Sequence, residues 1–203
     1  MIDQELRYQA WNRRAGDFYI AARKLFRAGM HYVGPGAFCG FQALENQAKA
    51  LLLYDDPNLD PEGMGHKLSR LARCVHARFG VEIHPVLTNW RYQAMTRYPH
   101  RGDERIFKRL EEENRKRLRE EGKNPDDNPD EVRGVGPRQG YAIMTGHLDP
   151  LDQAMIDMCV AGPRDRRFVL AQVLRDEKDE RYADLVCGNK HVHRLRQPTG
   201  PRA

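Results

Sequence analysis

Two pairs of arginine and histidine carry the side chains that metal-free RNA cleavage requires. They are Arg70 with His76 and Arg78 with His84, each pair separated by five residues. Histidine moves protons near neutral pH, and the planar guanidinium of arginine binds two phosphate oxygens at once. In a chain with 26 arginines and 8 histidines, roughly three Arg–His pairs at such spacings arise by chance, so the spacing alone carries no weight.

Helical geometry separates the two pairs. Arg70 and His76 fall within one predicted helix, where their side chains diverge by about 120°. Arg78 and His84 instead flank Gly80, where a turn can bring them together, and we predict them as the catalytic pair. In the alternative, the arginine satisfies carbonyls at a helix C-terminus and the histidine occupies a turn.

Glu45 is the third candidate for this site. It lies with Gln42 and Lys49 on a predicted helix whose other side is strongly apolar, and Glu45 precedes Lys49 in the favourable i,i+4 order. In the site interpretation Glu45 orients Arg78 or His84. In the alternative, it belongs to a solvated face, where an ion pair contributes only about a few tenths of a kcal/mol.

Arginine and tyrosine recur together further along the chain. Arg91 and Tyr92 are followed six residues later by Arg97 and Tyr98, so the two dipeptides point similarly to within about 120°. Such residues suit stacking on a base and holding a phosphate. We predict them, together with Arg70, as nucleic-acid-binding residues. In the alternative, the neighbouring tryptophan packs in the core and the arginines extend to solvent.

The charge distribution points to an anionic partner. The net charge is +5, and residues 66–101 alone hold seven lysines and arginines against one acid. Four of the eight histidines also lie in this range. A local excess of this kind is typical of proteins that bind nucleic acids, so we expect RNA or a nucleotide as partner.

Other classes of site have no support. The sequence contains no P-loop, no GxGxxG and no HExxH, and its single serine argues against a serine nucleophile. Cys187, His191 and His193 are spaced for metal binding, but a fourth ligand is not evident and the segment is a basic tail. We therefore expect no metal and no cofactor.

The compartment is predicted from the cysteines and the apolar runs. The four cysteines are far apart and form no CxxC pair, which indicates reduced thiols in the cytoplasm. No apolar run approaches the roughly 20 residues needed to span a bilayer, and the start does not resemble a signal peptide. We expect no membrane association.

The elements that must position these residues are helical almost everywhere. Apolar residues at steps of three and four predict packed helices over about 3–28, 35–54, 66–79, 85–98, 149–161 and 165–186. A highly charged helix is expected over 103–121 and a Gly/Pro-rich linker over 122–140. The fold prediction is an all-α, antiparallel up-and-down bundle of four or five helices with this charged helix and flexible linker inserted.

Four regions follow from this pattern. The predicted boundaries are 1–101 for the helical bundle, 102–148 for the charged helix and linker, 149–187 for the closing helices, and 188–203 for a basic tail.

Three elements together resemble the HEPN (higher eukaryotes and prokaryotes nucleotide-binding) family, in its RYP-bearing branch. They are the QAxExxxKA-like run within 40–52, the His-x-Leu at His66, and Arg97-Tyr98-Pro99. The resemblance covers about residues 5–100, with 149–175 as a candidate closing helix. It implies an all-α bundle, usually dimeric, with a link to nucleotides or RNA.

Family members divide into two groups. Many are metal-independent endoribonucleases of toxin–antitoxin or defence systems, which use an Arg-x4–6-His motif at a dimer cleft. Others lack that motif and act as partner modules beside nucleotidyltransferases. Phe79, directly after Arg78, departs from the branch that has a polar residue there.

Two hypotheses follow. In the first, a homodimer binds RNA or a nucleotide through its basic face, and Arg78, His84 and Glu45 would make it an endoribonuclease. In the second, the chain is a catalytically silent module that acts in a complex with a protein partner such as a nucleotidyltransferase or an antitoxin.

Overall fold

The computed structural model describes residues 4–29, 32–88, 104–133, 148–163 and 168–196, and all regular structure within these ranges is helical. This confirms the all-α prediction. The elements are α1 (Gln4–Ala28), α2 (Val33–Asp55), α3 (Leu68–Phe79), α4 (Pro85–Thr88), α6 (Glu104–Glu120), η2 (Pro125–Asp127), α7 (Pro129–Arg133), α9 (Leu148–Ala161), α10 (Phe168–Arg175), α11 (Glu180–Val186) and η4 (Val192–Leu195).

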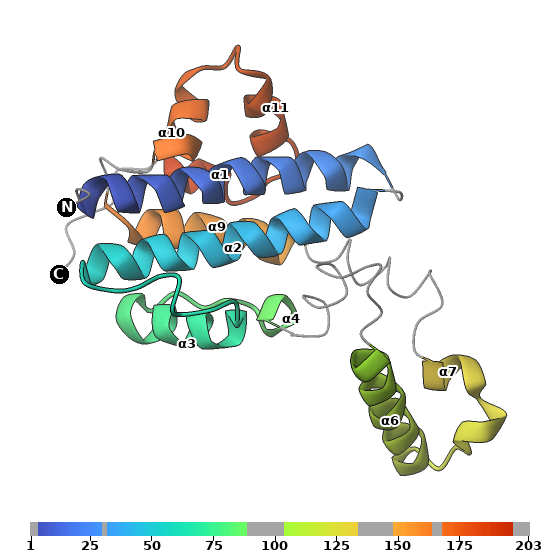
Figure 1. Ribbon diagram of the computed structural model, residues 1–203. Coiled ribbons are helices and arrows are strands. Elements are labelled where there is room, and N and C mark those ends of the chain that lie inside the picture. The colour runs from blue at the N-terminus through green and yellow to red at the C-terminus, as the bar shows by residue number, and fades with distance from the viewer. Residues whose placement is uncertain (1–3, 30–31, 89–103, 134–147, 164–167, 197–203) are drawn as a thin grey trace.

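The centre of the fold is an antiparallel hairpin of α1 and α2 (Figure 1). It is turned by Gly29, whose φ of 114° lies in the region that favours glycine. Helices α3 and α9 pack on α2, while α10 and α11 pack on α1. None of the described helices combines the length and the apolar character needed to cross a bilayer.

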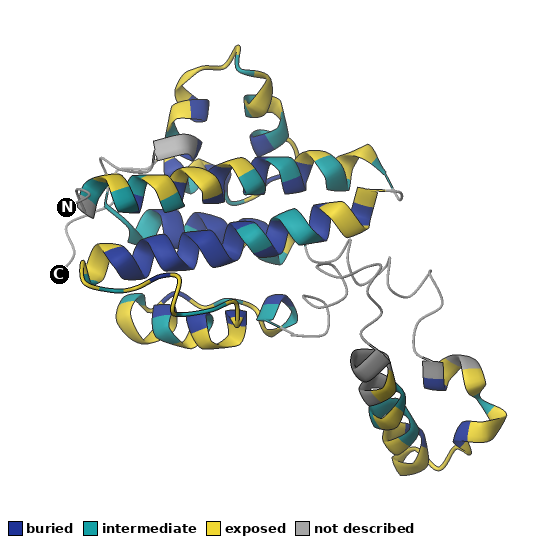
Figure 2. Cartoon of the chain, in the orientation of Figure 1, coloured by how far each residue is buried: buried dark blue, intermediate teal, exposed yellow. Residues whose placement is uncertain are grey.

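Helix α2 is covered on nearly every side, as Figure 2 shows. Every residue from Ala43 to Leu53 is buried, because α1, α3 and α9 all contact this helix. Burying each large aliphatic side chain contributes about 1.5–3 kcal/mol. The alternative in which Glu45 belongs to a solvated face was wrong, since the side chains of Glu45 and Lys49 are only 3% and 2% exposed.

Helix α3 is amphipathic and ends where the sequence predicted. Its buried residues Leu68, Leu71 and Val75 recur at steps of three and four. Gly80 caps its C-terminus in the left-handed conformation, with φ 68°. Pro85 starts α4 as expected, and the remainder of the predicted fourth helix lies outside the described residues.

Part of the predicted linker 122–140 is folded. Residues up to Arg133 form η2 and α7, which pack back against α6 (Figure 1). Leu118 of α6 and Val132 of α7 are buried, so this unit has a small apolar core of its own. The Asn124 side chain caps η2 by accepting a hydrogen bond from the Asp126 amide at 3.2 Å.

The C-terminal region differs from the prediction in two ways. Within the described residues 168–186, the helix predicted over 165–186 is two helices, α10 and α11, and the Asp179 side chain caps the start of the second. The predicted basic tail 188–203 is folded as far as residue 196: Val192 and Leu195 join the core, and Asn189 is also buried. Val192 and Leu195 are three residues apart, a spacing that suits a short helical turn. The prediction missed this spacing because it followed the excess of cations in the segment.

Candidate nucleic-acid-binding groove and a buried polar network

A groove of about 790 Å³ lies between α3, the segment 81–88 and the first turns of α9. Its titratable lining residues are Arg73, His76, Glu82 and His84. All four are exposed, so a ligand can reach them. Two histidines and an arginine facing one groove with a single carboxylate are suited to binding a phosphate and moving protons near it. We call this the α3–α9 groove.

The groove residues of α3 share one flank of that helix. Ser69, Ala72, Arg73 and His76 recur at i, i+3, i+4 and i+7, which places them in a row along the helix. The turn at Gly80 then returns the chain, so that His84 lines the same groove. In the described part of the chain, no carboxylate forms an ion pair with Arg73.

Arg78 does not belong to this groove. It follows His76 by two residues, which is about 200° round the helix. Its guanidinium Nη1 instead donates to Asp55 Oδ2 at 3.0 Å, at the end of α2. Within one chain, therefore, Arg78 and His84 do not form the predicted pair; the imidazole Nδ1 of His84 accepts a hydrogen bond from the Val86 amide at 3.2 Å.

Glu45 does orient a histidine, but that histidine is His66. Glu45 Oε1 lies 2.7 Å from Nδ1 of His66 and accepts a hydrogen bond from Lys49 Nζ at 2.9 Å. The carboxylate is buried within the bundle, and it is absent from the lining of the groove that contains His84.

The predicted nucleic-acid-binding residues have different outcomes. Arg70 is exposed on α3, between the groove flank and the flank of Arg78. Arg91, Tyr92, Arg97 and Tyr98 lie outside the described residues.

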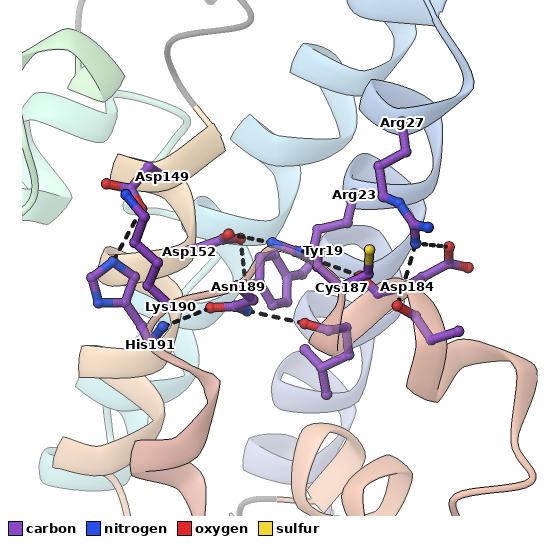
Figure 3. Close-up of polar contacts among 12 residues, drawn as sticks. Tyr19, Arg23, Arg27, Asp149, Asp152, Asp184, Cys187, Asn189, Lys190 and His191 are labelled. Carbon is purple, nitrogen blue, oxygen red and sulfur yellow. Dashed lines mark hydrogen bonds and ion pairs between the residues drawn. The ribbon is translucent and has the colours of Figure 1, made fainter.

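A second concentration of polar side chains is buried, and Figure 3 shows its contacts. It consists of Tyr19 and Arg23 of α1, Asp152 of α9, and Asn189 before η4, and we call it the buried network. The guanidinium of Arg23 pairs with the Asp152 carboxylate, and the Tyr19 hydroxyl donates to Asp152 Oδ1 at 2.7 Å. Asn189 Nδ2 donates to the Tyr19 hydroxyl oxygen at 2.9 Å.

The same network holds the end of α11. Arg23 Nε donates to the backbone carbonyl of Asp184 at 2.6 Å, and a second guanidinium nitrogen donates to the carbonyl of Cys187. A cation at a helix C-terminus is favourable, because the last carbonyls have no partner within the helix. Arg23 thus joins α1, α9 and the end of α11, and Asn189 extends the network to the segment that leads into η4.

Burial controls the protonation of this network. Burial raises the pKa of Tyr19 well above its ordinary value of 10.0, and the nearby Asp152 carboxylate raises it further. Burial also raises the pKa of Asp152, while hydrogen bonds from Arg23 and Tyr19 oppose that rise. Since every member finds partners inside the protein, the arrangement suits holding segments together rather than binding a ligand.

The sequence contained a signal for the groove that our prediction missed. Arg73 and His76 are three residues apart, a spacing that places two side chains on one helix flank. The buried network joins residues more than 120 positions apart in the chain, so no local spacing could have revealed it.

No group of three or more histidine, cysteine and carboxylate side chains in the described ranges is placed to hold a metal ion. No family model matches the chain, and no curated protein or solved structure is significantly similar to it.

Proposed function

We propose that this chain is a HEPN-like protein that binds RNA or a nucleotide through phosphate contacts in the α3–α9 groove. The observation that carries the proposal is the convergence of Arg73, His76 and His84 on one open groove. Residues 66–101 hold seven basic residues and one acid, and this local positive charge supports the same partner. The four free cysteines suit the reducing cytoplasm, where such a partner is found.

The binding proposal is tested with a fluorescently labelled single-stranded RNA and anisotropy at low salt. Replacing Arg73 with alanine removes a charge-assisted phosphate contact, so we expect the Kd to rise about tenfold. Arg78→Ala is the matched control, because it removes the same charge from the opposite flank of the same helix. We expect its Kd to stay within about twofold of wild type. Equal losses of RNA affinity in the two variants would mean that binding depends on the net charge of the protein and not on contacts in the groove.

RNA cleavage is the activity that two histidines in this groove favour. One would remove the proton of a 2′-hydroxyl and the other would protonate the leaving oxygen, while Arg73 holds the phosphate. In single-turnover assays with EDTA present, we expect His76→Gln and His84→Gln each to slow cleavage about 100-fold. His193→Gln is the control, since His193 is exposed on η4, away from the groove lining. Wild-type rates in both groove variants would reject this activity while leaving RNA binding intact.

The partner-module hypothesis has one structural feature in its favour. The α6–η2–α7 unit has its own buried residues, Leu118 and Val132, within the region predicted as an insertion. Such a unit can present charged helices to another protein. A stoichiometric partner that is lost on deletion of 102–148, in a protein without RNA affinity, would favour this function over the first.

A further inference from the structure

His66 is an exposed imidazole held by a buried carboxylate. Its side chain is 67% exposed, whereas the side chain of Glu45 beneath it is 3% exposed. The two are joined by a 2.7 Å contact between His66 Nδ1 and Glu45 Oε1. Exposed histidines in loops ordinarily move freely, so this pairing fixes one ring nitrogen and leaves the other facing outward.

The carboxylate is itself fixed and its charge is compensated. Lys49 Nζ, which is also buried, donates to the same Oε1 at 2.9 Å and lies 5.1 Å from the centre of the Trp11 ring. A rigid acceptor selects the tautomer in which His66 carries its proton on Nδ1. Nε2 then has an unshared electron pair directed away from Glu45.

This arrangement suits nucleophilic attack by Nε2. When Nε2 forms a bond, the ring becomes a cation, and the Nδ1 proton already faces a carboxylate that stabilises the new charge. Two neighbouring cations, Lys67 and Arg70, are exposed at the same end of α3 and attract anionic reactants.

We propose that His66 is a modification site that accepts a phosphoryl group on Nε2 from a small phosphoryl donor. With phosphoramidate, the electron pair of Nε2 attacks phosphorus and a P–N bond to the imidazole forms. The P–N bond of the donor breaks, and its electron pair leaves with neutral ammonia. The product is a phosphorylated imidazolium whose Nδ1–H donates to Glu45. This site is separate from the α3–α9 groove and does not depend on RNA binding.

The test is a competition among histidines within the wild-type protein. The protein is incubated with phosphoramidate, and phosphorylation at each histidine is followed over time by mass spectrometry. We expect His66 to be labelled about tenfold faster than His193, an exposed histidine without a carboxylate partner among the described residues. Phosphorus NMR should place the group on Nε2. Equal rates at the two histidines, or attachment at Nδ1, would overturn the proposal and leave His66 as a loop anchor.

Variants separate the role of the carboxylate from simple exposure. Glu45→Met with Lys49→Met removes both buried charges together, which avoids leaving one unpaired. After far-UV circular dichroism confirms that the double variant is helical, His66 labelling should fall to the rate of His193. Glu62→Gln is the control, because it removes an exposed carboxylate from the loop before His66. Fast labelling in the folded double variant contradicts the proposal, and the wild-type competition decides it if the variant does not fold.

Discussion

The buried network and the α3–α9 groove contain similar side chains but use them in opposite ways. In the network, Arg23 is fully buried and its guanidinium is engaged by a carboxylate and two backbone carbonyls. In the groove, Arg73 is exposed, and the described residues offer it no ion pair. A buried arginine whose three guanidinium nitrogens each bond a partner inside the protein cannot reach a ligand. An arginine in an open groove can, which is why we assign the first region to stability and the second to binding.

The largest expected effect is the loss of stability when the buried network is broken. Arg23→Met leaves the Asp152 carboxylate buried without its cation, so we expect a loss of about 3–5 kcal/mol in the free energy of unfolding, measured with urea. Arg27→Ala is the control, since Arg27 pairs with Asp184 at the surface and should cost less than about 1 kcal/mol. The double variant Arg23→Met with Asp152→Leu should recover part of the loss, because it leaves no unpaired charge. A loss for Arg23→Met no larger than for Arg27→Ala would show that the network does not hold the fold together.

The next effect is smaller and depends on pH. Tyr19→Phe removes one donor to Asp152 and one acceptor from Asn189, and we expect it to cost about 1–3 kcal/mol at neutral pH. The folded pKa of Tyr19 is raised, so its contribution is fully present below about pH 10 and is lost as the pH rises further.

Alkaline unfolding curves measure this difference. Above about pH 10 the wild-type protein should lose stability more steeply than Tyr19→Phe. Tyr32→Phe changes an exposed tyrosine and should reproduce the wild-type slope. Parallel slopes for wild type and Tyr19→Phe would contradict the assignment of a raised pKa to this side chain.

The smallest effect on stability is expected in the groove. Arg73→Ala and His76→Ala remove exposed side chains, so each should change the free energy of unfolding by less than about 0.5 kcal/mol. The same variants are expected to weaken RNA binding. Substitutions in the buried network, in contrast, are expected to lower stability. A groove variant that unfolds the protein would remove the distinction between the two regions.

Local spacing predicted most of the helices but not the surroundings of α2. The steps of three and four among Leu68, Leu71 and Val75 were sufficient to predict α3, and Gly80 marked its end. The same reasoning failed for Glu45, because an amphipathic pattern assumes that one face meets solvent. Helix α2 is contacted by three others, and its residues Glu45 and Lys49 are buried as an internal ion pair.

The candidate site was predicted only in part for a related reason. His84 was identified from the turn at Gly80, but its neighbours in the groove are Arg73 and His76 rather than Arg78. A fixed Arg–His separation says nothing about which flank of a helix each side chain occupies, whereas the 3.6-residue period does. Residues brought together by tertiary packing, such as Asp152 and Arg23, could not be paired from the sequence.

The central claim is that the α3–α9 groove receives the phosphates of RNA, and NMR of the histidine rings tests it most directly. Single-stranded RNA is titrated into protein labelled at histidine, and the ring signals are assigned by single substitutions. We predict saturable shifts for His76 and His84, with His193 unchanged. Shifts confined to His193, or no change at either groove histidine while RNA is bound, would contradict the account.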